Sequence, residues 1–347
     1  MDIVIRKIFI IHTYGIGDLV MLTPALKLLR ENYPRAVIDI FVGEPIVGEV
    51  LLENKTVNEV LRFNPKKHNL LDKLKFIYKL RKRGYDLSIV STGINPLKGG
   101  LFSFLAGAKQ RLGEYVKSKI PFYTLQVKAD GSKHKVYTNL NLLSALGIKT
   151  EKLPETFFEV NLEDIEFAKN FIRQLGAENK ILVGFHPGAG ENQQFKVWPK
   201  ENFIKLGQKI LESYKNSCVI LFGGPREKEL CLEIKEKIGS DVFLATDLTL
   251  KQVASLIDNC KIFVASDSGL GHISSATNAN VISIFGPTDY KRSVPFSQRV
   301  HLIKEKCRYP YNDLINPNYD AKRTHTCLSK ITPEIVFQEF EKILGRR

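Results

Sequence analysis

The chain has 347 residues, of which 44% are hydrophobic and 25% are charged, and its formal net charge is +14. This balance is typical of a globular protein and excludes a disordered, collagen-like or coiled-coil chain. Because single hydrophobic cores stop growing at roughly 250–300 residues, the length favours two domains.

The first predicted element is a buried strand at residues 8–11, a short and continuous apolar run. The run is too short for a signal peptide, and no small-residue cleavage site follows it. No later stretch approaches the roughly 20 apolar residues that span a bilayer. We therefore expect a cytoplasmic protein that is soluble or lies on a membrane surface.

The following elements alternate between helices and strands. Leu19, Leu22, Leu26 and Leu29 share one side of a predicted helix over residues 18–32. Strands are predicted at 37–42, 59–63 and 87–90, and a helix over 135–146 ends at Gly147, a typical C-cap. This alternation predicts a parallel sheet covered by helices on both faces.

A basic segment lies within this half of the chain. Residues 65–135 hold 16 Lys and Arg against 4 Asp and Glu, a net charge of +12, interleaved with apolar and aromatic residues. Such a charge attracts an anionic acceptor or an anionic lipid surface. A merely solvated lysine-rich surface is the alternative. Nucleic acid is disfavoured, because no nucleic-acid-binding motif accompanies the charge.

The alternating pattern restarts in the second half. Strands are predicted at 181–185, 218–222, 261–265 and 281–285, with helices over 200–214, from 226, over 250–257 and over 271–277. Polar residues interrupt the pattern around 154–164, and a last amphipathic helix over 333–344 begins after Thr332. We expect a domain at 1–160, a second at 161–330, and a C-terminal helix at 331–347 that packs toward the first domain.

The loop after the first strand carries a candidate site, because ligands of open parallel sheets bind outside the carboxyl ends of the strands. Gly15 and Gly17 permit a tight turn and a close approach of a ligand. Asp18 follows them at the start of the helix, where it either caps the helix or accepts a proton from an attacking hydroxyl. A dinucleotide fingerprint would need a third glycine where Val20 stands, which disfavours an NAD dehydrogenase.

Three loops of the second half have the same position after a strand. The small residues of the first can present backbone amides to phosphate, and Lys196 shortly after it could neutralise a diphosphate. In the second, Glu227 either stabilises a helix N-terminus or accepts hydrogen bonds from a ribose. The third offers glycine and serine to phosphate oxygens. The loops are His186-Pro187-Gly188-Ala189-Gly190, Gly223-Gly224-Pro225-Arg226-Glu227 and Ser266-Asp267-Ser268-Gly269-Leu270-Gly271-His272.

The five cysteines are too few for a disulfide scaffold and fit a reducing compartment. Cys307 and Cys327, with His301 and His325 nearby, match no common zinc spacing. Buried free thiols are favoured for this pair, and a disulfide or a zinc site is the alternative. Cys218, Cys231 and Cys260 are predicted to be packing residues.

Taken together, these loops resemble glycosyltransferase family 9, the ADP-heptose:lipopolysaccharide heptosyltransferases. The order and spacing of the motifs fit over nearly the whole chain. The resembling stretches are residues 14–26, His186-Pro187-Gly188-Ala189-Gly190, Lys196-Val197-Trp198-Pro199, Gly223-Gly224-Pro225-Arg226-Glu227, Asp267-Ser268-Gly269-Leu270-Gly271-His272 and Phe285-Gly286-Pro287-Thr288.

The resemblance implies a GT-B fold, an α/β architecture of two Rossmann-like domains that face each other across a cleft. The first domain would bind the acceptor and the second a nucleotide-sugar. Asp18 would be the general base and Lys196 would bind the donor phosphates. The loop from Asp267 to His272 would lie at the diphosphate, and Glu227 would reach the ribose.

The implied reaction inverts the anomeric centre and needs no metal or other cofactor besides its donor, expected to be an ADP-sugar. The implied acceptor is an anionic glycolipid of the lipopolysaccharide core, at the cytoplasmic face of the inner membrane. Two alternatives share the fold: a nucleotide-sugar 2-epimerase, and a non-catalytic protein that binds glycan or nucleotide-sugar. The epimerase would need further acid and base residues, and the presence of both Asp18 and Lys196 argues against the non-catalytic alternative.

Overall fold

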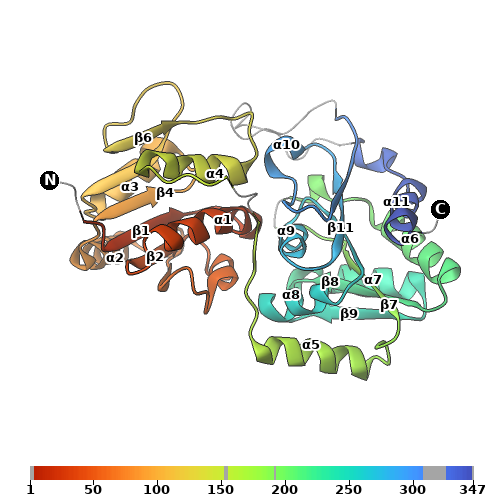
Figure 1. Cartoon of the computed structure of the whole chain (residues 1–347). Coiled ribbons are helices and arrows are strands. Elements are labelled where there is room, and N and C mark those ends of the chain that lie inside the picture. The colour runs from red at the N-terminus through yellow and green to blue at the C-terminus, as the bar shows by residue number, and fades with distance from the viewer. Residues whose placement is uncertain (1–3, 152–154, 191–192, 308–325, 346–347) are drawn as a thin grey trace. The chain divides into compact units, whose positions relative to one another are not determined.

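A computed structural model describes residues 4–151, 155–190, 193–307 and 326–345 of the chain. It divides into two compact units, Met1–Glu159 and Val160–Arg347, which are described separately here. Each unit contains a six-stranded parallel sheet with helices packed on it (Figure 1).

The first unit is built on a sheet of order β3-β2-β1-β4-β5-β6. Its centre is formed by two strands that are almost wholly buried, β1 and β4. Continuous apolar strands are expected where helices cover both faces of a parallel sheet. The strands are β1 Lys7–His12, β2 Val37–Val42, β3 Glu59–Arg62, β4 Leu87–Val90, β5 Gln110–Tyr115 and β6 Leu125–Lys128.

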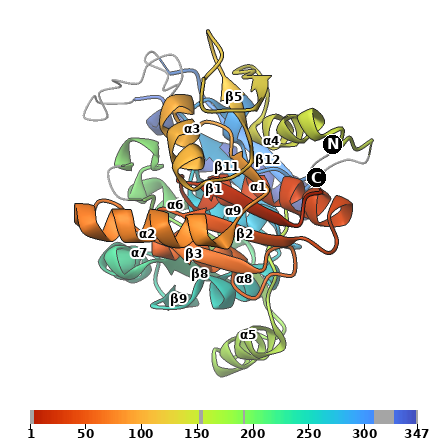
Figure 2. The ribbon, with the colours of Figure 1, turned by 90° about the vertical axis from the view of Figure 1, so that its left-hand side faces the viewer.

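Four α-helices accompany this sheet: α1 Ile16–Asn32, α2 Leu70–Arg83, α3 Pro96–Leu105 and α4 Lys135–Leu143. Helices α1 and α4 pack against each other, whereas α2 and α3 lie in front of the sheet in Figure 2. Beneath α2 and α3, the ring of Phe9 stacks on Tyr85 at a centroid distance of 4.8 Å and meets Phe102 edge-on at 6.1 Å. Chain order reverses between β1 and β4, the point at which open sheets bind ligands.

The second unit has a sheet of order β12-β11-β10-β7-β8-β9. Its strands are β7 Ile181–His186, β8 Ser217–Gly223, β9 Val242–Thr246, β10 Ile262–Ser266, β11 Asn280–Phe285 and β12 Val300–Lys304. Its α-helices are α5 Leu162–Gln174, α6 Lys200–Ser213, α7 Lys228–Ile238, α8 Leu250–Asp258, α9 Gly269–Ser275, α10 Tyr290–Ser293 and α11 Pro333–Ile343.

The prediction of parallel sheets covered by helices is confirmed in both units. The predicted strands are all present, and the first of them extends to His12, one residue beyond its predicted end. No bounds were predicted from the sequence for the strands β5, β6, β9 and β12 or for the helices α2, α3, α5 and α10.

The C-terminal helix α11 differs from its prediction in where it packs. The sequence placed it toward the first domain, but Val336, Phe337 and Phe340 belong to the core of the second unit. Helix α11 contacts α6 and β11 there. The predicted start is confirmed, since Thr332 is the N-cap residue and Pro333 the first helical residue. The amphipathic pattern identified the buried face of the helix but not its partner.

Cys307 and Cys327 form a disulfide, so the expectation of free thiols at these positions was wrong. Their Cα atoms are 5.2 Å apart, a separation that a disulfide can bridge. The other three cysteines are free and buried, as predicted. Among the described residues, no group of three or more His, Cys, Asp or Glu side chains could hold a metal ion. His325 lies outside the described residues.

No helix within the described ranges is long and apolar enough to cross a membrane.

Candidate active site

In the first unit, the candidate site lies at the carboxyl ends of β1 and β4. Gly15 is the N-cap residue of α1, with extended backbone, and Gly17 and Asp18 lie in the first turn of the helix. A Cβ at Gly15 would meet nothing within 4 Å, so neither space nor backbone conformation demands glycine there. Because Gly15 is the N-cap residue, Asp18 does not cap the helix, which was one of its two predicted roles.

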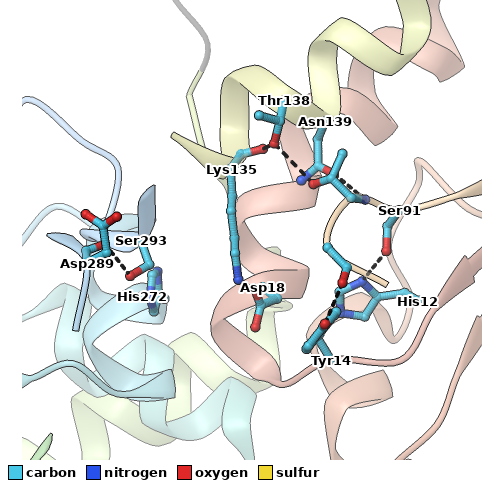
Figure 3. Close-up of polar contacts among 12 residues, drawn as sticks. His12, Tyr14, Asp18, Ser91, Lys135, Thr138, Asn139, His272, Asp289 and Ser293 are labelled. Atoms are coloured by element: carbon cyan, nitrogen blue, oxygen red, sulfur yellow. Dashed lines mark hydrogen bonds and ion pairs between the residues drawn. The ribbon is translucent and has the colours of Figure 1, made fainter. Parts of the chain in front are cut away.

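The carboxylate of Asp18 forms an ion pair that the sequence did not predict (Figure 3). The ammonium of Lys135, the first residue of α4, lies 2.5 Å from Oδ1 of Asp18. The side chains are 15% exposed for Lys135 and 25% exposed for Asp18, so water reaches the pair only in part. The carboxylate is thus held at the carboxyl edge of the sheet in a defined orientation.

Several polar side chains surround this pair in Figure 3. The Nδ1 atom of His12 lies 3.1 Å from the hydroxyl of Ser91, and both residues are buried. Burial lowers the pKa of His12 to about 4, although the charge of Asp18 acts in the opposite direction. The imidazole is therefore neutral at neutral pH and leaves Asp18 without a second cation from this side.

The loop after β4 is tied to α4 and to the loop after β1. Thr92 donates its hydroxyl to Oδ1 of Asn139 at 2.8 Å, and Tyr14 donates its hydroxyl to the carbonyl of Gly93 at 2.6 Å. These bonds join three chain segments around Asp18. They fix the backbone on which the carboxylate and its lysine are mounted.

In the second unit, three loops meet at the carboxyl edge of the sheet, where β7 lies between β10 and β8. His186 ends β7 and links the other two loops. Its Nδ1 lies 2.9 Å from the hydroxyl of Ser268, after β10, and its Nε2 lies 3.3 Å from Oε2 of Glu227, after β8. The sequence predicted a binding role for all three residues but not this contact between them.

These contacts form a chain across the three loops. The amide of Gly271 donates to Oγ of Ser268, which in turn contacts Nδ1 of His186. The carboxylate of Glu227 contacts Nε2 of His186 and accepts from the Gly224 amide at 2.8 Å. Burial raises the pKa of Glu227, but the hydrogen bond and charge of His186 and the Gly224 amide outweigh burial, so the net pKa is below the usual value.

Gly188 is the glycine of this region that the structure needs. A Cβ at this position would lie 1.8 Å from Oε1 of Glu227. Gly190 is different, because a Cβ there would meet nothing within 4 Å, and Ala189 is buried. Of the three small residues predicted to form a phosphate loop, Gly188 is thus the one fixed by close packing.

Lys196 lies next to the loop after β10. Its ammonium is 3.2 Å from Oδ2 of Asp267, and the side chains are 14% and 8% exposed. Nε2 of His272 lies 3.9 Å from Oδ1 of the same aspartate. The structure therefore brings together the cation and the polar loop that the sequence predicted for a diphosphate.

Packing holds this segment in place. The amide of Trp198 donates to Oγ of Ser266 at 2.9 Å, and its indole Nε1 donates to the carbonyl of Ile331 at 2.8 Å. Trp198 is wholly buried and belongs to the core of the second unit. Leu270 is buried in the first turn of α9, next to Gly269.

The sequence reasoning missed Lys135 and His12 as members of the first site. Both depend on contacts between residues far apart in the chain, which periodicity does not reveal. One signal was available for Lys135, because a lysine in the first turn of a helix is electrostatically unfavourable and calls for an anionic partner.

Comparison with known proteins supports a single family. Residues 73–316 match the family model described as glycosyltransferase family 9 (heptosyltransferase). The chain is 27% identical to lipooligosaccharide heptosyltransferase 2 of Haemophilus ducreyi, over 98% of this chain and 99% of that protein.

Solved structures show the same fold. A family 9 glycosyltransferase from Veillonella parvula has a TM-score of 0.82 at 20% identity, with 100% of this chain and 99% of that chain covered. An Escherichia coli heptosyltransferase, solved with ADP-2-deoxy-2-fluoro heptose, has a TM-score of 0.73 at 20% identity, with 97% and 99% covered. The prediction of a GT-B fold is confirmed in the architecture of the two sheets.

Proposed function

Since this chain belongs to glycosyltransferase family 9, we propose that it is an inverting heptosyltransferase that moves a heptose from an ADP-sugar to a hydroxyl of an anionic lipopolysaccharide core. Its family makes it a transferase and not a nucleotide-sugar epimerase or a non-catalytic binding protein. The ADP-sugar is the donor substrate, and we expect no metal or other cofactor in the reaction.

The observation that carries the proposal is the ion pair between Asp18 and Lys135 at the carboxyl edge of the first sheet. A carboxylate paired with a lysine can accept the proton of an acceptor hydroxyl. The hydroxyl oxygen then forms a bond to the anomeric carbon as the bond to the diphosphate breaks. The bonding electrons leave with the nucleotide diphosphate, and attack from the opposite side inverts the anomeric centre.

The second unit supplies groups suited to the leaving diphosphate. Lys196 and the amides near Gly188 and Ser268 would stabilise its growing negative charge in a preorganised site. On binding, the phosphates would compete with Asp267 for the ammonium of Lys196. Glu227, ionised and oriented by His186, is suited to accept hydrogen bonds from ribose hydroxyls.

We further propose that the face formed by α2 and α3 rests on an anionic membrane surface that presents the acceptor. Leu97, Leu101 and Phe104 are 53%, 41% and 49% exposed and follow one side of α3. Helix α2 adds an exposed stripe of apolar residues, and its 14 residues hold six Lys and Arg against one Asp. The bases provide attraction to anionic headgroups, and the apolar side chains can enter the interface.

The experiment that tests the function is a transfer assay with ADP-heptose and a heptose-deficient lipopolysaccharide core, read by mass spectrometry. The wild type should add one heptose mass to the acceptor. Asp18→Asn should lower the rate by about 100-fold or more, the usual contribution of a general base, while ADP binding by calorimetry stays unchanged. A wild type that transfers no sugar, or an Asp18→Asn variant of wild-type rate, would contradict the proposal.

A further inference from the structure

We propose that Lys135 is a positioning residue for the transfer reaction: it keeps Asp18 ionised and directs its carboxylate toward the acceptor hydroxyl. The inference rests on the proposed function, because it takes Asp18 as the general base. Lys135 acts through Asp18 and is not itself assigned a contact with the reacting atoms.

The geometry of the pair is specific. The ammonium of Lys135 contacts Oδ1 of Asp18 at 2.5 Å across 117 residues of sequence. Both side chains are at most one-quarter exposed, so the surrounding water screens their attraction only partly. An opposite charge this close favours the ionised form of a carboxyl group.

Lys135 is held in this position by the elements around it. It begins α4, which packs on α1, the helix that carries Asp18. Its carbonyl accepts from Oγ1 of Thr138 at 3.0 Å, and its ammonium lies 5.3 Å from the centre of the Tyr14 ring. A cation over an aromatic face gains a further favourable interaction. The lysine is therefore fixed on the scaffold that also fixes its partner.

The position of Lys135 is unfavourable for its own helix. The N-terminus of an α-helix carries a partial positive charge, which repels a cation in the first turn. His134, the preceding N-cap residue, already accepts the amide of Val136, so the helix start does not need a lysine for capping. Lys135 is thus unfavourable for the start of α4 but is paired with Asp18 of α1. Such a conflict between local preference and a specific contact is typical of a functional site.

The other titratable groups around Asp18 do not replace this charge. His12 is buried and neutral at neutral pH, as described above. Tyr14 is bound to Gly93 through its hydroxyl, and Glu114 accepts from the amide of that glycine at 3.3 Å. Tyr14 and Glu114 bring no positive charge to the carboxylate. Of the groups named here, Lys135 is the one that brings a positive charge to Asp18.

The inferred role fits the chemistry of the step. Lys135 contacts Oδ1, so we assign the proton of the acceptor hydroxyl to Oδ2. The hydroxyl oxygen forms its bond to the anomeric carbon, and the diphosphate leaves with the electrons of the broken bond. Lys135 keeps its own protons throughout and holds the carboxylate in the same orientation before and after transfer.

The test compares Lys135→Met and Lys135→Arg with wild type through the pH dependence of kcat/KM for the acceptor. For Lys135→Met we expect the acidic limb to move to higher pH by about one unit, the low end of the usual range because the pair is partly exposed. On the acidic limb, below the pKa values of both proteins, the rate should fall by up to about tenfold, and on the plateau at higher pH it should approach the wild-type rate. Lys135→Arg should retain most of the wild-type profile.

Lys133→Met is the matched control, because Lys133 precedes the same helix but pairs with Asp130 on the surface, at 3.4 Å and 62% exposed. It should leave the profile unchanged. All variants should bind ADP as wild type does, and their melting temperatures should confirm that they fold.

An unmoved acidic limb in Lys135→Met would overturn the inference. So would a loss of equal size at every pH that Lys135→Arg does not rescue. A higher acceptor KM without a shift of the limb would also overturn it, since Lys135 would then bind the acceptor. A wild type that transfers no heptose contradicts the proposed function itself, and the two failures are thereby distinguished.

Discussion

Individual side chains in this protein carry charge states that their surroundings dictate, and His12 is the clearest case. It ends β1 beside the candidate base, yet burial keeps its imidazole neutral, with a pKa lowered from 6.5 to about 4. Lys135 brings a positive charge to Asp18, and the neutral His12 does not.

This histidine predicts how stability depends on pH. Between about pH 6.5 and 4 the unfolded chain binds the proton of His12 and the folded chain does not, so the free energy of unfolding falls as pH falls through this range. The gap between the two pKa values corresponds to at most roughly 3 kcal/mol.

We expect His12→Gln, which can keep a bond to Ser91, to lose less stability than wild type between about pH 7 and pH 4.5. Urea unfolding at several pH values measures the difference. Parallel stability curves for the two proteins would show that His12 does not titrate in this way. The same comparison with His301→Gln, a partly exposed histidine bound to Glu339, serves as the control.

A second prediction at this scale concerns Lys196. Loss of one charge-assisted contact to phosphate typically costs 1.5–3 kcal/mol, so Lys196→Ala should weaken ADP binding by roughly 10- to 100-fold. Isothermal calorimetry measures the affinity. Lys228→Ala removes a lysine from an exposed pair with Asp247 in the same unit and should bind ADP normally. Equal affinities for all three proteins would remove Lys196 from the phosphate site.

At the scale of elements, the candidate site of the second unit depends on close packing between the segments after β7 and β8. A methyl group at Gly188 would occupy the place of the Glu227 carboxylate, which His186 and Gly224 hold from the other sides. The loop after β7 can therefore approach the loop after β8 this closely only with glycine at position 188. The two strands set the distance between the loops, and the absence of a side chain at Gly188 leaves room for the Glu227 carboxylate.

We accordingly expect Gly188→Ala to displace Glu227 and to weaken ADP binding by about tenfold, with a small loss of melting temperature. Gly190→Ala is a matched control in the same loop, since its Cβ would point into open space. In a double-mutant cycle, Gly188→Ala should cost little once Glu227 is already alanine. Full additivity of the two changes would mean that the clash is relieved elsewhere.

The elements that the sequence predicted and those it did not predict differ in burial. The central strands β1, β4, β7 and β10 are continuous apolar runs, and all were predicted. The missed β6 and β12 are edge strands without a fully buried residue, so their sequences have no strong apolar pattern. The loops after β7, β8 and β10 were recognised as candidate sites because they follow predicted strands. Lys135 was missed because its partner lies on another helix.

For the whole molecule, the distribution of charge and exposed apolar surface distinguishes the first unit from the second. The basic segment found in the sequence contains both α2 and α3, where Arg81 of α2 donates to the carbonyl of Leu105 at 3.2 Å. The bases and the exposed apolar stripes therefore belong to one helical layer on one sheet (Figure 2). This combination is typical of proteins that lie on a membrane surface.

We predict that the double change Leu101→Ser and Phe104→Ser lowers co-sedimentation with vesicles that contain anionic lipid by at least about threefold, because less apolar area enters the interface. Wild-type binding should weaken further as salt rises, since surface charges are screened. Leu162→Ser, at an 83% exposed leucine of α5 in the second unit, is the control. Equal binding of all three proteins would remove α3 from the membrane face.

The boundary between Glu159 and Val160 has a practical consequence. Because α11 stays with the core of the second unit, the polypeptide passes from one unit to the other once, and each unit is an uninterrupted stretch of sequence. A cut at this boundary would sever no secondary-structure element, since the nearest ones are α4 with its short following 3₁₀ turn, which ends at Leu146, and α5, which starts at Leu162. The two stretches can therefore be produced as separate polypeptides and joined by ligation, so that isotopes label the resonances of one unit alone.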